Sequence, residues 1–227
     1  MGKKPKKTTA PAPSRSRKAK RRTWIAVGIL AAIILTGYLV SRIPEVESVY
    51  GEGDPVKGAR QARVRIVEYS DFQCPACRKA QEPLKRILEE YGETVQIIFN
   101  DFPLVTNHPN ALPAAEAAQC AYSQQRFWEY HDLLFEEQDI WSQSTDPQSI
   151  FTGYARDTGL NTEQFSRCLE NHETRKAVRE DMKEGEALRI RSTPTFFIND
   201  TRLVGPATFN NFKEAIDAQL SRGDKEE

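Results

Sequence analysis

The sequence of 227 residues is poor in the side chains that most often bind metals, since it contains only four cysteines and three histidines. Cys74 and Cys77 form one close pair, whereas Cys120 and Cys168 are each isolated along the chain. A structural zinc site normally needs a second close pair of ligands. The sequence therefore argues against a metal centre, and we expect the chain to need neither a metal nor an organic cofactor.

Acidic residues are absent from residues 1–22, which hold ten of the chain's 32 lysines and arginines. Since the chain also has 32 acidic residues, 32 − 10 leaves 22 basic against 32 acidic residues after Arg22. Overall neutrality thus hides a net charge of 22 − 32 = −10 on the remainder. Large apolar side chains are also missing from this segment after Met1. It cannot bury enough surface to offset its ordering entropy, so we predict a disordered cytoplasmic tail.

Charged residues are also missing from residues 24–40, an apolar run of 17 residues. As a helix, this run spans roughly 25 Å, the short end of what crosses a bilayer. Because ten positive charges precede the run and few follow it, the N-terminus is expected in the cytoplasm. We predict a single-pass anchor in the cell membrane at residues 23–41, in contact with lipid through residues 24–40 and followed by an extracytoplasmic domain.

A cleaved signal peptide is the alternative reading of this segment, because a positive head and an apolar run fit both. The run is long for a signal peptide and no Ala-X-Ala site follows it, which favours an uncleaved anchor. A basic head can also bind nucleic acid, but next to an apolar span it more simply sets topology and contacts anionic lipid. We therefore predict no nucleic-acid partner. Export permits disulfide bonds.

The rest of the chain divides by composition and periodicity. Glycine, proline and charges predict a stalk at residues 42–62, before a folded domain at residues 63–222 and a short C-terminal tail at residues 223–227. Apolar runs at residues 64–69 and 94–99, joined by an amphipathic helical pattern, predict a parallel βαβ unit.

The second half of the folded domain starts with helical patterns and ends with strand chemistry. No strand signal interrupts residues 107–190, so we predict an all-helical insertion there. Strand-forming residues return after Arg191, with a hairpin turn at Asn199-Asp200 and a closing helix that ends near Leu220.

Cys74 and Cys77 lie between the first predicted strand and the helix that follows it. A thiol at a helix N-terminus feels the positive end of the peptide dipoles, which stabilises its thiolate. Two residues of separation let the second thiol attack the first sulfur once a mixed disulfide has formed. The spacing predicts a redox-active Cys74–Cys77 pair; a zinc knuckle or two unreactive thiols are the alternatives.

Glu68 points to the same face of its predicted strand as Val64 and Ile66, into the core. A buried carboxyl is costly when ionised, and this one lies on the strand that leads to Cys74. It is therefore a candidate proton shuttle that takes or gives a proton as the thiols exchange. The alternative is a residue at the strand end that turns to solvent or pairs with Arg65.

Four separated motifs resemble those of a known family. They are Glu68–Cys77, Ala117–Ala121, Phe127–Asp132 and Ser192–Asn199. Together they resemble the DsbA-type thiol–disulfide oxidoreductases of the thioredoxin superfamily. The resemblance implies a thioredoxin-like α/β fold with a helical insertion, here preceded by one transmembrane helix. It implies that Cys74 is the nucleophile and Cys77 the resolving thiol. It also implies a cis peptide at Thr193–Pro194, where Thr193 contacts the substrate backbone.

The same resemblance bears on two further sites. Family members carry a buried acidic residue where this chain has Glu68, which supports the shuttle reading. Some members also have a second disulfide in the helical insertion, where Cys120 and Cys168 lie on apolar faces. These two could bond if their helices bring the Cα atoms within about 5–6 Å; two small buried thiols are the alternative.

The dipeptide between the cysteines, Pro75-Ala76, departs from the Pro-His of the best-known oxidases. Because this dipeptide strongly influences thiolate stability, the direction of electron flow stays open. We expect a disulfide-forming oxidase that acts on exported protein thiols and is recycled by a membrane redox partner. A reductase or isomerase with the same site is one alternative, and a membrane-tethered chaperone or binding module with structural cysteines is another.

Overall fold

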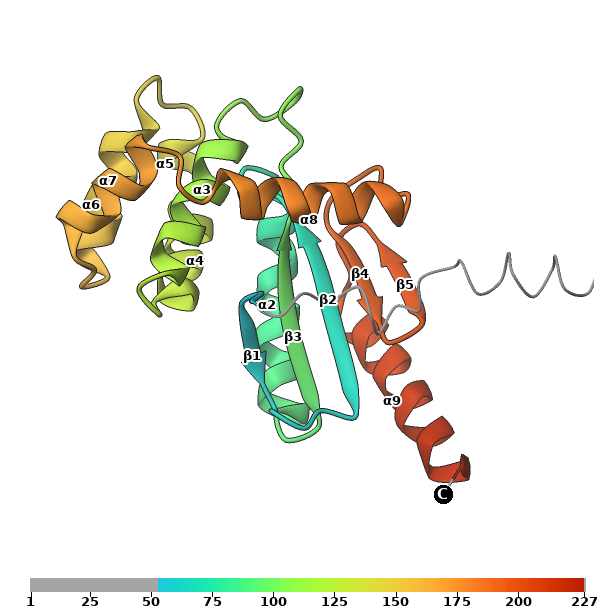
Figure 1. Ribbon diagram of the computed structural model, residues 1–227. Coiled ribbons are helices and arrows are strands. Elements are labelled where there is room, and N and C mark those ends of the chain that lie inside the picture. The colour runs from blue at the N-terminus through green and yellow to red at the C-terminus, as the bar shows by residue number, and fades with distance from the viewer. Residues whose placement is uncertain (1–52, 227) are drawn as a thin grey trace, which may run out of the picture. The chain divides into compact units, whose positions relative to one another are not determined.

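The computed structural model describes residues 53–226 of the chain (Figure 1). The tail predicted at residues 1–22 and the anchor predicted at residues 23–41 lie outside the described residues. Within residues 53–226, no helix combines the length and the apolar character that a membrane crossing requires.

A five-stranded sheet in the order β1-β3-β2-β4-β5 forms the centre of the described part. β2 and β3 are parallel and joined by α2, so the predicted βαβ unit is confirmed. β4 pairs antiparallel with both β2 and β5, and the turn predicted at Asn199-Asp200 joins β4 to β5. The strands are β1 (Val56–Gly58), β2 (Val64–Ser70), β3 (Val95–Asp101), β4 (Thr195–Ile198) and β5 (Thr201–Val204).

The stalk predicted at residues 42–62 is wrong at its C-terminal end, because β1 lies within that range and belongs to the sheet. Val56 lies opposite Ile98 of β3, and the indole N–H of Trp128 donates to the Val56 carbonyl at 2.8 Å. The folded part therefore begins before residue 63. All three residues of β1 are exposed, so the strand has no alternation of buried apolar and exposed polar residues by which the sequence could have predicted it.

Six helices separate β3 from β4, as the predicted all-helical insertion at residues 107–190 requires. A disulfide joins Cys120 of α3 to Cys168 of α7, with 6.0 Å between the Cα atoms. The helices are α3 (Ala111–Tyr122), α4 (Phe127–Glu136), α5 (Gln138–Trp141), α6 (Pro147–Asp157), α7 (Thr162–Glu170) and α8 (Arg175–Ala187).

Both faces of the sheet are covered, which explains why β2 is apolar on both sides. Val64 and Ile66 face α2 (Pro75–Tyr91) and α9 (Phe209–Glu226), whereas Val67 and Tyr69 face α8. The helix α9 also corrects the C-terminal tail predicted at residues 223–227, since it continues to Glu226. The carboxyl end of β2 leads directly to the N-terminus of α2, where the cysteines lie.

Candidate active site

The two neighbouring cysteines lie at the start of α2 as free thiols. Cys74 is the N-cap of the helix, and Pro75 occupies its first turn, where a missing N–H costs nothing. Cys77 lies one turn further in and is 0% exposed, whereas Cys74 is 8% exposed. One sulfur can therefore meet a substrate while the other is shielded from it.

The environment gives the two thiols opposite acidities. The pKa of Cys74 falls from 9.0 to about 5, chiefly because the side chain of Cys77 hydrogen-bonds to its thiolate. The pKa of Cys77 is raised well above 9.0, chiefly by burial and then by the thiolate of Cys74 and the charge of Glu68. At neutral pH the pair thus holds one proton, on Cys77, and one thiolate, on Cys74.

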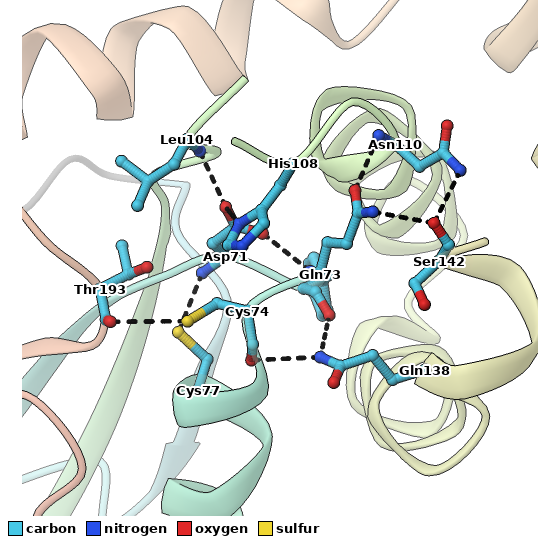
Figure 2. Close-up of polar contacts among 11 residues, drawn as sticks. Asp71, Gln73, Cys74, Cys77, Leu104, His108, Asn110, Gln138, Ser142 and Thr193 are labelled. Carbon is cyan, nitrogen blue, oxygen red and sulfur yellow. Dashed lines mark hydrogen bonds and ion pairs between the residues drawn. The ribbon is translucent and has the colours of Figure 1, made fainter. Parts of the chain in front are cut away.

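The peptide bond between Thr193 and Pro194 is cis and lies just before β4. Its Thr193 carbonyl oxygen is 3.6 Å from the Sγ of Cys74 (Figure 2). The Oγ1 of Thr193 is buried and has no hydrogen-bond partner among the described residues. The structure therefore brings the Thr193–Pro194 segment, which is 119 residues from Cys74 in the chain, against the more exposed thiol.

Glu68 is 1% exposed on β2, so the alternative in which it turns to solvent is wrong. Ser70 Oγ donates to its Oε1 at 2.7 Å and Gln81 Nε2 donates to the same oxygen at 3.1 Å. Burial outweighs these bonds and raises the pKa of Glu68 from 4.5 to about 7. Near neutral pH this carboxyl can either accept or give a proton.

A pocket of about 710 Å³ reaches Glu68. Its wall includes Gln81 of α2 and Trp128, His131 and Phe135 of α4. The pocket is large enough for many water molecules, so the Glu68 carboxyl has a route for proton exchange with solvent.

Sequence reasoning missed the residue that organises the cysteine loop, Asp71. Its backbone N–H donates to the Sγ of Cys77 at 3.4 Å, and its carbonyl accepts from the N–H of Cys74 at 3.0 Å. Its carboxylate accepts from Gln73 N at 2.7 Å and lies 2.7 Å from Nδ1 of His108 (Figure 2). An aspartate that bonds to the backbone two residues on is a common turn former, a signal that the sequence did contain.

Amide side chains connect the cysteine loop to the helical insertion. Gln138 of α5 donates to the carbonyl of Phe72 at 2.6 Å and to that of Cys74 at 3.1 Å. Gln73 donates to the Ser142 carbonyl at 2.9 Å and accepts from the N–H of Asn110 at 2.7 Å. These partners are 37 to 69 residues apart, so no local pattern in the sequence could have paired them.

Across residues 53–226, no three His, Cys, Asp or Glu side chains form a group that could hold a metal ion. The chemistry that the site offers comes from its own groups: a thiolate, a shielded thiol, a carboxyl that titrates near neutrality and a hydrogen-bond donor at the inner sulfur. This set is suited to two-electron exchange between a dithiol and a disulfide.

Comparison with known proteins places this chain in a family. A family model described as Thioredoxin matches residues 51–218. The chain is 34% identical over 163 residues to "Na(+)/H(+) antiporter NhaA 3" of Salinispora tropica, covering 72% of this chain and 24% of that protein. It thus spans about a quarter of that relative's length.

Two relatives resemble this chain over most of their own lengths. "Probable disulfide bond formation protein D" of Bacillus anthracis is 29% identical over 170 residues, covering 73% of this chain and 77% of that protein. The crystal structure of oxidised BdbD from Bacillus subtilis superposes with a TM-score of 0.68 at 25% identity, covering 75% of this chain and 94% of that one.

Proposed function

Because the chain belongs to the thioredoxin family, we propose that it is a thiol–disulfide oxidoreductase that forms disulfides in exported proteins through Cys74 and Cys77. One observation carries the proposal: the more exposed thiol, Cys74, caps α2 beside a fully shielded thiol, Cys77, and their pKa values are displaced in opposite directions. Such a difference between two thiol pKa values is typical of reactive cysteines and is not expected of cysteines with a purely structural role. The Bacillus relative named for disulfide bond formation supports the same activity.

The oxidising reaction starts from the Cys74–Cys77 disulfide. A substrate thiolate attacks Sγ of Cys74, the S–S bond breaks, and Cys77 leaves as a thiolate that takes a proton. A second substrate thiolate then attacks the substrate sulfur of the mixed disulfide, and Cys74 leaves. Two electrons pass from the substrate to the cysteine pair, and the substrate gains one disulfide.

The low pKa of Cys74 favours this direction. A thiol with a pKa of about 5 is a good leaving group in the last step, because its thiolate is stable at neutral pH. The same stabilisation favours the reduced form of the enzyme, which makes the disulfide a stronger oxidant. The side chain of Cys77 supplies the hydrogen bond that most favours the thiolate. It thus acts where the familiar Pro-His dipeptide is absent.

Glu68 acts as the proton shuttle for Cys77. In its protonated form it gives a proton to the Cys77 thiolate as that thiolate leaves. In its ionised form it takes the proton back when Cys77 attacks. The pKa of about 7 populates both forms at neutral pH, and the pocket beside Glu68 lets the proton reach solvent.

Thr193 and Pro194 form the substrate-binding ledge beside Cys74. The Thr193 carbonyl lies 3.6 Å from the sulfur, so an extended substrate chain that lies along this segment passes close to Cys74. A substrate held there presents its sulfur in line with Cys74.

The site operates outside the cytoplasm, tethered to the cell membrane through residues 24–40. The charge pattern around that run supports this topology, and the Cys120–Cys168 disulfide suits an oxidising compartment. Each turnover leaves Cys74 and Cys77 reduced. A membrane redox partner must therefore remove two electrons per cycle.

The direction of electron flow decides between an oxidase and a reductase or isomerase. The full-length chain is equilibrated with glutathione buffers and its reduced fraction is measured by alkylation. A reduction potential near about −120 mV supports net oxidation, whereas one near about −270 mV contradicts it. If Cys74 instead shows an ordinary thiol pKa of about 8.5 and the chain does not exchange with a model disulfide, the cysteines are structural and the alternative of a tethered chaperone or binding module holds.

A further inference from the structure

We propose that Asp71 is a positioning residue of the redox site, which aims its own backbone N–H at the sulfur of Cys77, and that His108 holds it in that orientation. This inference rests on the proposed function, because it concerns the step in which Cys77 leaves the disulfide. It adds a residue outside the Cys-Pro-Ala-Cys segment to the machinery of exchange.

The leaving sulfur needs a hydrogen-bond donor because it is 0% exposed. A thiolate that forms there has no bulk water to stabilise it, and burial is the largest reason for its raised pKa. The Ser70 hydroxyl, which also lowers the pKa of Cys77, donates to Glu68 at 2.7 Å. The N–H of Asp71, 3.4 Å from the sulfur, is a backbone donor aimed at the position where negative charge develops.

The side chain of Asp71 fixes the direction of that N–H. Its buried carboxylate accepts from the backbone N–H groups of Gln73 at 2.7 Å and Leu104 at 2.8 Å, and contacts His108 Nδ1 at 2.7 Å. The carbonyl of the same residue accepts from Cys74 N at 3.0 Å. With both the carboxylate and the carbonyl held, the backbone at Asp71 has little freedom to rotate away from Cys77.

His108 is the part of this clamp that a substitution can change cleanly. It is the one side chain among the three donors, and it is 21% exposed at the edge of the site. It comes from the segment between β3 and α3, so it joins that segment to the cysteine loop (Figure 2). Its removal leaves every backbone donor of the clamp in place and loosens only the carboxylate.

The chain offers a matched control at a distance from the cysteines. His172 Nδ1 also lies 2.7 Å from a buried carboxylate, that of Glu116, in the helical insertion. The backbone of His172 has a positive φ of 54°, so a leucine there costs more than a leucine at an ordinary position. The substitution His172→Leu removes a histidine–carboxylate contact of the same length, while Arg175 still pairs with Glu116, and it tests for a general loss of stability.

The test measures how fast dithiothreitol reduces the oxidised full-length chain. Alkylation traps the thiols that have formed at each time, and the rate constant is calculated per concentration of dithiothreitol thiolate. His108→Leu is expected to slow this step about 3- to 10-fold, the loss from misaligning one donor to a developing charge. His108→Asn, whose amide can replace Nδ1 as the donor, is expected to restore the wild-type rate, and His172→Leu to leave it unchanged. The reduction potential stays the same in all three, because Cys77 is uncharged in both end states.

Each contrary result has a distinct meaning. If the wild type undergoes exchange and His108→Leu matches it, or if His172→Leu slows the step equally, Asp71 and His108 are not positioning residues. If the wild type itself shows no exchange, the proposed function fails first. Should His108→Leu not fold, His108→Gln, whose amide lies too far out to replace Nδ1, serves in the same comparison.

Discussion

The substitution Glu68→Gln should slow exchange and stabilise the protein at the same time. The pKa of Glu68 is about 7 when folded and 4.5 when free, a difference of 7 − 4.5 = 2.5 that corresponds to about 3 kcal/mol. Because the folded pKa is raised, the stability associated with this group is complete below pH 4.5. It is lost as the pH rises through 7.

Glutamine removes the charge but keeps an oxygen that can accept from Ser70 and Gln81, as Oε1 does. At pH 8 the variant should therefore exceed the wild type in unfolding free energy by up to about 3 kcal/mol, and the gain should vanish near pH 4. Denaturant unfolding of both proteins at several pH values measures this difference directly.

The same substitution removes the proton shuttle. The rate constant for reduction of the wild-type disulfide, calculated per concentration of dithiothreitol thiolate, should be higher below pH 7. There Glu68 carries the proton that Cys77 needs. In Glu68→Gln this rate should fall about tenfold or more and lose its inflection near pH 7. Stopped reactions at pH 5 to 9, quenched by alkylation, provide the profile.

Asp101→Asn is the matched control for this experiment. Asp101 is also fully buried and its pKa is also raised to about 7 by burial, but its carboxylate accepts from Gln119, whereas Glu68 is the carboxyl whose charge raises the pKa of Cys77. It should gain stability above pH 7 without a change in exchange rate. The reasoning is refuted if Glu68→Gln keeps the wild-type pH–rate profile, or if its stability gain is the same at pH 4 and pH 8.

Two further predictions concern the other cysteine chemistry. The rate of alkylation of Cys74 in the reduced chain should be half-maximal near pH 5. The substitution Cys77→Ala should raise this midpoint, because the Cys77 hydrogen bond is the largest cause of the low pKa. An unchanged midpoint contradicts that cause. Replacing both Cys120 and Cys168 by alanine should lower the unfolding free energy by about 4 kcal/mol, since their disulfide closes a 48-residue loop, and should leave the exchange rate intact. A loss of exchange without a loss of stability would mean that this disulfide acts on the site itself.

The sequence was sufficient for the elements whose signals are local. The alternation of Val64 and Ile66 and the helical spacing after Cys77 predicted the βαβ unit, and the lack of strand signals over residues 107–190 predicted the insertion. It failed where the signal was weak or absent. The strand β1 has three exposed residues, and its place in the sheet depends on β3, about 40 residues further on.

The site shows the same division. The cysteines and the buried Glu68 follow from spacing and strand direction, which are properties of a few neighbouring residues. The clamp of Asp71 by His108 and the bonds from Gln138 to the cysteine loop depend on how loops from different elements pack. Such contacts are set by tertiary structure, and a single sequence contains no record of which distant polar groups meet.

The central claim is that Cys74 is the attacking thiol of a redox pair, and trapping tests it most directly. The full-length chain with Cys77→Ser is mixed with a disulfide-containing unfolded protein, and the adducts are mapped by mass spectrometry. The account predicts a stable mixed disulfide on Cys74 that reductant releases. The absence of any adduct, or an adduct on Cys120 or Cys168 in its place, would contradict it.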